Sequence, residues 1–254
     1  MQTIRTLLDD VDFQVHLFVK DLKTNEYLLT ERMDDVFPSA SVIKVPILFA
    51  VLNEVEKNQL SLNHIINIAP EHKVDYSVIT EQDLTKSTVY ELLFWMIVAS
   101  DNSATNVLID LLGFDKLNTY FKNIGLTKTC LQRKMMDFNK MKQGYDNVTT
   151  ARDMAHLWTM IYEQKLLTKN LNQLAIDILC KGRDYERLKR YIGDVRIAHK
   201  TGSLDTVSHD VGIVYHKTTD YCLGVFLTEL RDFEMGKRFI GRISKIVFDY
   251  FERG

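Results

Sequence analysis

Ser41-Val-Ile-Lys-Val-Pro-Ile-Leu-Phe-Ala-Val-Leu52 is the segment around which the rest of the chain is most readily arranged. Its residues are apolar on nearly every side of a helix, and a helix without a polar face is a buried one. Pro46 falls within the opening turns, where proline is tolerated best. We therefore expect a central buried helix that begins at Ser41 and carries Lys44 one turn further on.

Strands flank this helix on both sides in the sequence. Phe13–Val19 alternates apolar and polar residues, and Tyr27–Leu29 follows a turn, so the two predict an opening hairpin. Val211–Tyr215 and Tyr221–Leu227 are a second pair of β-rich runs joined by a turn. Arg238–Phe251 then has apolar residues at helical spacing. The order predicts an α+β fold in which both ends of the chain meet in one antiparallel sheet.

The pattern in the middle of the chain predicts helices. We therefore expect a single domain over 1–254 that is divided into two lobes. We expect an α/β lobe, with an antiparallel sheet and flanking helices, from about 1–38 and 190–254. An all-helical lobe from about 39–189 is inserted into it. With 254 residues and 46% hydrophobic content, the chain is long and apolar enough for one sizeable core.

Composition excludes several classes of function. The formal net charge of −2 argues against a nucleic-acid partner. Three cysteines without a CxxC pair argue against a disulfide framework or a metal site, so we expect no metal and no cofactor. No run approaches the ~20 apolar residues of a membrane span. The first residues lack the apolar core of a signal peptide. We expect a monomer acting on a small molecule, cytoplasmic if the chain is complete and secreted or in the cell envelope if a leader was removed.

Three short motifs occur in order: Ser41-Val-Ile-Lys44, Ser100-Asp-Asn102 and Lys200-Thr-Gly202. They match the S-x-x-K, S-D-N and K-T-G set of class A β-lactamases and penicillin-binding proteins. The first motif alone is expected roughly once by chance in a chain of this length, whereas all three in order is a coincidence on the order of one in a thousand. The set therefore predicts a serine hydrolase site.

The first motif combines a nucleophile and its base. A serine hydroxyl is a weak nucleophile until a base takes its proton. Positions i and i+3 share a helix face, so Ser41 Oγ and Lys44 Nζ are expected within hydrogen-bond reach. Burial favours the neutral amine of Lys44, which then acts as the base. The N–H of Ser41 at the helix start is one candidate oxyanion donor. Alone, the motif also fits a helix N-cap and a lysine at the edge of the core.

The other two motifs supply proton transfer and binding. Ser100 offers a second hydroxyl that passes a proton to the leaving nitrogen, and Asn102 offers an amide to the side-chain carbonyl of the substrate. Lys200 and Thr201 are candidates for binding a substrate carboxylate. Alternatively, Ser100 and Asn102 mark only a turn between helices, and Lys200 lies on an exposed edge strand.

Backbone groups complete the third motif. Gly202 lets a ligand lie against the strand because it carries no side chain. The N–H of the next residue, Ser203, is the second candidate oxyanion donor.

The chain resembles the class A β-lactamases over nearly its whole length. Besides the three motifs, Asp75–Thr80 is similar to the family's loop with an aromatic gatekeeper, here Tyr76, and Ser100–Asn106 is similar to its extended helix motif. Thr149–Met154 resembles the segment after the omega loop. The resemblance implies a serine acyl-enzyme mechanism, an α/β lobe with an all-helical lobe, and no metal.

One departure concerns the omega loop, where the family carries R-x-E-x-x-L-N. Here the stretch is Arg133-Lys-Met-Met-Asp-Phe-Asn139. Arg133 and Asn139 match, and Asn139 is taken as a substrate-binding residue, but Met135 replaces the glutamate that activates water. A thioether cannot deprotonate water, and Asp137 is two residues away with a shorter side chain. We expect fast acylation and slow deacylation.

A second departure is His209. Many relatives carry an arginine on the strand after K-T-G, and His209 aligns with that region. It is a candidate contact for the substrate carboxylate, partly charged at neutral pH; the alternative is a structural histidine at the strand edge.

Two further functions stay open from the sequence. A D,D-carboxypeptidase or a small-ester hydrolase would use another group to guide water to D-Ala-D-Ala-like or ester substrates. A β-lactam-binding sensor or trap would stay acylated.

Overall fold

The computed structural model describes residues 1–253 and contains one five-stranded antiparallel sheet. The strand order is β2-β1-β9-β8-β7, so the two ends of the chain meet at its centre. The predicted α+β fold is confirmed. The five strands are β1 (Gln14–Asp21), β2 (Tyr27–Glu31), β7 (Ile197–Leu204), β8 (Val207–Val214) and β9 (Tyr221–Thr228).

Pairing between the ends of the chain fixes the sheet. β1 pairs with β9 along its whole length, from Gln14 opposite Thr228 to Asp21 opposite Tyr221. β8 begins at Val207, four residues before the predicted start, because its first residues pair with β7. This longer edge hairpin carries the Lys200-Thr-Gly202 segment.

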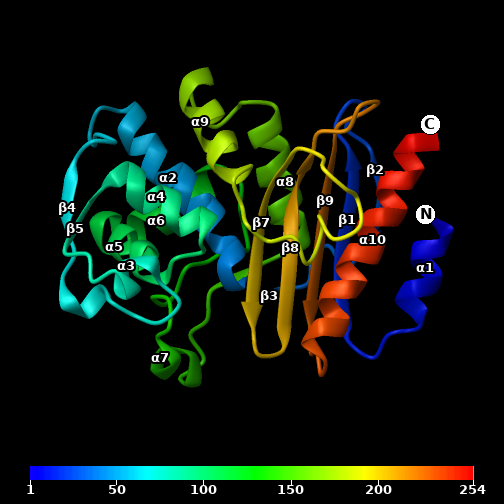
Figure 1. Ribbon diagram of the computed structural model, residues 1–254, viewed down its shortest axis with the longest axis horizontal. Coiled ribbons are helices and arrows are strands. Elements are labelled where there is room, and N and C mark those ends of the chain that lie inside the picture. Colours follow the sequence, from blue (N-terminus) through cyan, green and yellow to red (C-terminus); the bar gives the residue numbers. More distant parts are fainter. Residues whose placement is uncertain (254) are drawn as a thin grey trace.

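Two helices cover one face of the sheet. α10 (Phe233–Arg253) lies across it, and α1 (Gln2–Asp9) runs beside α10 at the outer surface (Figure 1). Both helices bury apolar side chains in a cluster with the strands, which accounts for the helical spacing of apolar residues near the C-terminus.

The other face of the sheet meets a group of helices with α2 (Lys44–Glu56) at its centre. α2 is packed by α4, α5, α6 and α9, and most of its side chains are buried. The helices around it are α4 (Val89–Val98), α5 (Asn102–Leu112), α6 (Phe114–Asn123), α8 (Ala151–Tyr162) and α9 (Lys169–Leu179).

Short elements close the loops between these helices. They are the 3₁₀ turns η1 (Ala40–Ile43) and η2 (Pro70–His72), helices α3 (Val78–Glu81) and α7 (Phe138–Lys142), and the two-stranded pairs β3 (Phe37–Pro38) with β6 (Val148–Thr149) and β4 (Ile65–Asn67) with β5 (Lys86–Thr88).

The central helix differs from its prediction at its start. α2 begins at Lys44, and Ser41 lies in the preceding 3₁₀ turn η1, which contacts β7. A capping box begins α4, since Glu91 N donates to Thr88 Oγ1 at 3.2 Å and Thr88 N donates to Glu91 Oε2 at 2.8 Å. Among residues 1–253, no helix combines the length and apolar character needed to span a bilayer.

Candidate active site

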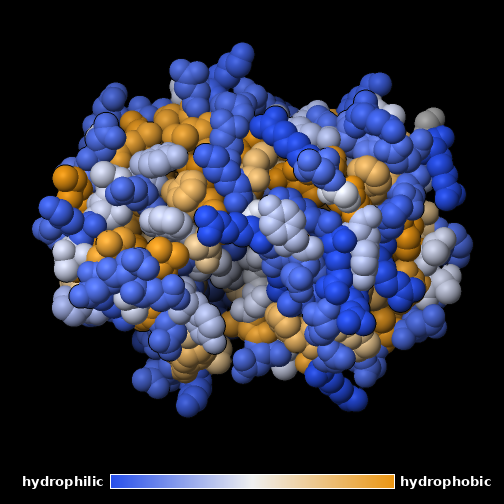
Figure 2. Space-filling view, viewed as in Figure 1, coloured by the Kyte–Doolittle hydropathy of each residue, from blue (hydrophilic) through white to orange (hydrophobic). Residues whose placement is uncertain are grey.

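One cavity of about 790 Å³ brings the three motifs together between the helices and the edge of the sheet. η1 provides Ser41, the loop between α4 and α5 provides Ser100, and β7 provides Thr201, Gly202 and Ser203. The same face is hollowed near its centre in the space-filling view (Figure 2). Tyr76 and Asn102 also line this cavity, as do Met135, Met136, Phe138, Arg187 and Phe233.

Lys44 is fully buried beneath the cavity and donates three hydrogen bonds. Its Nζ lies 2.6 Å from Ser100 O, 3.2 Å from Ser100 Oγ and 2.8 Å from Asn102 Oδ1. Burial, followed by the positive charge of Lys200, holds the pKa of Lys44 well below its usual range. Within the described residues Ser41 Oγ is not among the hydrogen-bond partners of Lys44 Nζ, which lies against Ser100 and Asn102. A neutral Lys44 therefore has to turn from Ser100 to Ser41 before it accepts a proton.

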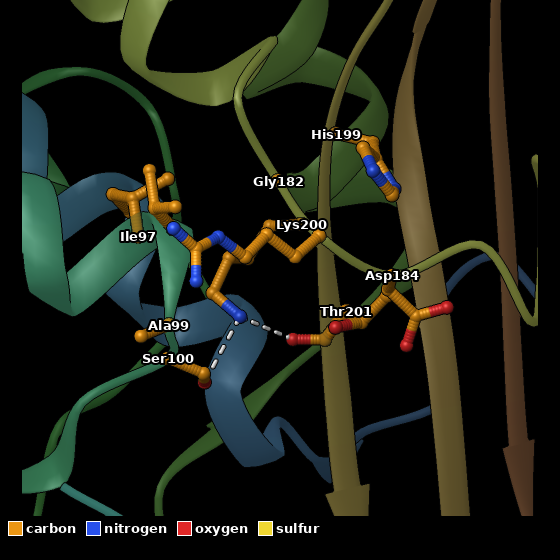
Figure 3. A pocket seen from close by; sticks show the side chains of 10 residues that line it. Ile97, Ala99, Ser100, Gly182, Asp184, His199, Lys200 and Thr201 are labelled. Carbon is orange, nitrogen blue, oxygen red and sulfur yellow. Dashed lines mark hydrogen bonds between the residues drawn. The ribbon is translucent and has the colours of Figure 1, made fainter. Parts of the chain in front are cut away.

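Ser100 connects two lysines. Its Oγ accepts from Lys44 Nζ and also from Lys200 Nζ, at 3.0 Å. Lys200 additionally donates to Thr201 O at 2.8 Å, and both bonds are visible in Figure 3. Burial lowers the pKa of Lys200 to about 7, against the opposing effect of the Asp210 carboxylate. A hydroxyl between two amines of lowered pKa is suited to moving a proton.

Gly202 brings the strand against the nucleophile. A Cβ at this position would lie 3.0 Å from Ser41 N, so a side chain here would crowd the close approach of the β7 backbone to η1. The backbones of Ser41 and Ser203 therefore border the same space, as two oxyanion donors require.

Four residues that line the cavity have a left-handed backbone although none is glycine. Their φ angles are +44° at Ala40, +55° at Tyr76, +53° at Ser100 and +64° at Met136. Such conformations are costly and persist where the surrounding structure enforces them, most often at functional sites. Strain therefore marks this cavity independently of the motifs.

Asp101, the middle residue of the second motif, holds the loops together. Its carboxylate accepts from Ser77 Oγ at 2.8 Å, from Ala104 N at 2.8 Å and from Ile79 N at 3.0 Å. It thus caps α5 and anchors α3 beside it, which fixes the loop that carries Tyr76.

The segment at 133–142 places Met135 in the wall of the cavity. Asn106 accepts from Met135 N at 2.7 Å and donates to Met135 O at 3.2 Å. Asp137 points elsewhere, because its carboxylate accepts from Lys140 N and caps α7. Asn139 is exposed within α7, outside the lining of the cavity. Of the residues expected here, only Arg133 lines the cavity with Met135, and the structure does not bring Asn139 to it.

His209 also lies away from the cavity. It is buried, its Nε2 donates to Pro38 O at 2.9 Å, and its ring packs against Phe37 and Phe226. Burial lowers the pKa of His209 to about 4, so the ring is neutral at pH 7. This placement fits the alternative of a structural histidine, and we leave His209 out of the proposed binding residues.

Arg187 is a cationic residue of the cavity that no motif in the sequence predicted. It lines the cavity with its guanidinium held by three partners: Nη2 donates to Ser203 Oγ at 2.7 Å, Nε donates to Ser208 Oγ at 2.9 Å, and Nη1 pairs with Asp184. It comes from the connection between α9 and β7, which has no periodicity and no motif. Only its position next to β7 in three dimensions identifies it as a cationic group of the site.

Solved structures of β-lactamases and of PBP-A share this architecture. PBP-A is 27% identical, with a TM-score of 0.92 over 100% of this chain and 96% of its own. A β-lactamase from Chitinophaga pinensis is 25% identical, with a TM-score of 0.92 over 98% of both chains. An ancestral class A β-lactamase is 26% identical, with a TM-score of 0.91 over 98% of both.

The fold is therefore that of the class A β-lactamases and PBP-A. Residues 1–251 match the family described as the beta-lactamase enzyme family. The chain belongs to this family, as its three motifs indicated.

Proposed function

We propose that this protein is a serine hydrolase that is acylated at Ser41 by β-lactam-type amides and releases the acyl group slowly. The observation that carries the proposal is the hydrogen-bonded set of Lys44, Ser100 and Lys200 beside Ser41. It supplies a base and a proton path for acylation, whereas Met135 occupies the wall where a water-activating carboxylate is expected.

Acylation follows from these groups in a defined order. Neutral Lys44 accepts the proton of Ser41, and Ser41 Oγ attacks the amide carbonyl. The N–H groups of Ser41 and Ser203 stabilise the oxyanion. Ser100 then gives its proton to the leaving nitrogen and recovers one from Lys44.

The carboxylate of the substrate binds at the cationic end of the cavity. Thr201 and Arg187 line this end of the cavity, and Lys200 lines the adjoining pocket together with Thr201. Arg187 replaces His209 in this role, because a guanidinium pairs with carboxylates through parallel hydrogen bonds and keeps its charge at neutral pH.

Deacylation is slow in this proposal because Met135 presents an apolar side chain to the ester. A thioether neither orients nor deprotonates water. A related protein supports the chemistry: a single-residue mutant of PBP-A, 27% identical to this chain over its whole length, was solved as an acyl-enzyme complex with penicillin G.

The test is intact-protein mass spectrometry during incubation with benzylpenicillin, beside Ser41→Ala. We expect an adduct on the wild type alone that outlasts the free drug. An adduct that disappears while penicillin is consumed would contradict slow deacylation. If penicillin leaves the protein unmodified, D-Ala-D-Ala peptides and small esters become the substrates to try.

The same apolar wall favours a second candidate function. A protein that stays acylated serves as a β-lactam sensor or trap. An adduct lifetime of many hours, together with no turnover of peptides or esters, would support this function over that of a hydrolase.

A further inference from the structure

A histidine and an aspartate are buried together in the sheet, outside the lining of the cavity at Ser41. His199 Nδ1 donates to Asp210 Oδ1 at 2.8 Å, and the two side chains are 1% and 0% exposed. A buried carboxylate is costly, and exchanging a buried ion pair for apolar residues of similar volume is often neutral or stabilising. Folding alone therefore does not account for this pair.

Two glycines make room for the imidazole ring. A Cβ at Gly212, directly opposite on β8, would lie 2.6 Å from His199 Cβ, which is too close for two carbon atoms that are not bonded. A Cβ at Gly182, after α9, would lie 3.1 Å from His199 Nε2. The ring is thus enclosed between β8 and the connection from α9, which fixes the direction of its bond to Asp210.

Asp210 also binds the connection that carries Arg187. Its Oδ2 accepts from Leu188 N at 3.0 Å, and Leu188 is the residue after Arg187. The guanidinium of Arg187 is bound in turn by the hydroxyls of Ser203 and Ser208. The carboxylate therefore fixes the backbone from which Arg187 extends, and the two serines fix its guanidinium.

The charge of Asp210 also acts on Lys200. Lys200 follows His199 on β7, and Figure 3 shows the two side chains leaving the strand in opposite directions. Burial lowers the pKa of Lys200, and Asp210 has the largest opposing effect. Burial also raises the pKa of Asp210, but His199 and the N–H of Leu188 outweigh it and hold this pKa below its usual range. Asp210 is therefore ionised at neutral pH.

The other charges around Lys200 come from two further sides. Asp184 and Arg187 act on it from the connection before β7, and Lys44 lies on the side of α2. The two cations favour loss of the Lys200 proton, and Asp184 favours its retention. Because Asp184 is paired with the Arg187 guanidinium, Asp210 is the carboxylate left to balance the Lys200 ammonium.

Resting on the proposed function, we propose that the His199–Asp210 pair is a positioning device for the carboxylate-binding end of the cavity. Asp210 holds Arg187 in place through Leu188 and supplies the negative charge that balances Lys200. His199 keeps Asp210 ionised and correctly oriented. Neither member of the pair touches the substrate, so their effect is confined to substrates that carry a carboxylate.

The test compares benzylpenicillin with its methyl ester, which lacks the negative charge. Second-order rate constants for acylation of Ser41 are measured by intact-protein mass spectrometry between pH 6 and pH 9, and their ratio is taken at each pH. Both penicillins need the same nucleophile and base, so the ratio reports on the groups that bind the carboxylate. In the wild type the ratio should fall as pH rises through about 7, where Lys200 loses its proton.

Two variants remove the charge or its support. Asp210→Asn keeps the shape and the acceptor for Leu188 N, and we expect a ratio about tenfold lower at pH 7 with a midpoint about one pH unit lower. His199→Phe keeps a ring between the two glycines without the donor, and it should lower the ratio several-fold. The methyl ester should react within about threefold of the wild-type rate in both variants.

The matched control is Glu252→Gln. Glu252 accepts from another buried histidine, His216 Nε2, at 3.1 Å, near the end of α10. It does not line the cavity at Ser41, so its loss of charge should leave the ratio unchanged. A ratio that falls equally in this variant would overturn the proposal, because any buried histidine–carboxylate pair would then have the same effect.

A merely structural pair would act on both penicillins alike. Equal slowing of the two by Asp210→Asn, or a ratio equal to that of the wild type at every pH, would therefore overturn the proposal. If only His199→Phe folds, by circular dichroism, an unchanged ratio in that variant has the same consequence. Failure of both variants to fold would assign the pair to the stability of the hairpin and overturn the proposal as well.

The proposed function fails in a different way, namely if neither penicillin acylates Ser41 in the wild type. The phenylacetyl esters of 3-hydroxybenzoic acid and of its methyl ester then replace the penicillins, since they also differ only in a carboxylate on the leaving group. A Ser41-dependent ratio that falls in Asp210→Asn would still support the role of the pair. The absence of that fall, or of any reaction, would overturn it.

Discussion

The two walls of the cavity are held in place by different kinds of interaction. On the wall of Lys44, Ser100 and Lys200, buried polar atoms are joined by hydrogen bonds between side chains. On the wall at 133–142, the backbone of Met135 is hydrogen-bonded to Asn106, and its largely buried side chain packs in the hydrophobic core while it borders the cavity. The first wall retains proton-transfer groups, and the second offers an apolar surface in their place.

This difference separates the two halves of an acyl-enzyme reaction. Forming the ester needs a base, a proton donor and oxyanion donors, all of which the first wall and β7 provide in our proposal. Breaking the ester needs an activated water, for which the second wall offers no carboxylate, because Asp137 is used to cap α7. Changes to either wall should therefore affect different steps.

The largest effect is expected from Lys44→Met, which keeps the length and apolar stem of the side chain and removes the amine. Without its base, Ser41 should be acylated about a thousandfold more slowly, within the range for loss of a general base. The measurement is the rate of adduct formation with benzylpenicillin. A variant that folds, by its circular dichroism, and still reacts at a rate near the wild type would show that another group activates Ser41.

Met135→Glu tests the second wall by adding the missing carboxylate. We expect release of the acyl group to accelerate on the order of a hundredfold, with acylation changed by less than about threefold. The readout is adduct lifetime after removal of free drug, and Met135→Gln is the control of equal size without a base. An unchanged lifetime in Met135→Glu would show that the apolar wall is not what slows deacylation.

Much of the fold was accessible from the sequence because its signals are local. The alternating run of β1 and the β-rich runs of β8 and β9 each reflect a periodicity or a composition that neighbouring residues determine. The start of the central helix was placed three residues early. The residues before Lys44 form the 3₁₀ turn η1 instead, which contacts β7, a strand far away in the sequence.

Residues of the candidate site could be predicted from the sequence only where they belong to a motif. Arg187 was missed because its proximity to Ser203 arises from the path of an irregular connection. Asn139 was expected in the cavity from alignment to a pattern, but the cap that Asp137 provides for α7 turns it outward. The strained backbone of Ala40 and Met136 has no sequence signature, since neither residue type favours φ > 0.

The protonation of Lys200 gives a further test of the polar wall, because it changes with pH. Its pKa of about 7 means that the ammonium loses its proton as pH rises from 6 to 8. Substrates that carry a carboxylate should therefore bind more weakly at pH 8, by a few-fold to about tenfold in KM or in the concentration that gives half-maximal acylation. An ester without a carboxylate serves as the control and should show no such loss. A loss of equal size for both substrates would assign the change to another group, such as Lys44.

The last effect concerns the stability of the support beneath Ser41 rather than the activity of either wall. His209 binds Pro38 O three residues before the nucleophile, and burial lowers its pKa to about 4 from an unfolded value near 6.5. The unfolded chain therefore takes up a proton below pH 6.5 that the folded chain refuses until about pH 4. His209 should cost on the order of 3 kcal/mol of stability across that range, with none lost above pH 6.5.

Urea unfolding at pH 7 and pH 4.5 measures the loss, and His209→Gln, which keeps a donor for Pro38 O, should reduce it. An equal loss in that variant would place the acid sensitivity elsewhere, with His16 the next candidate, because burial also lowers the pKa of His16.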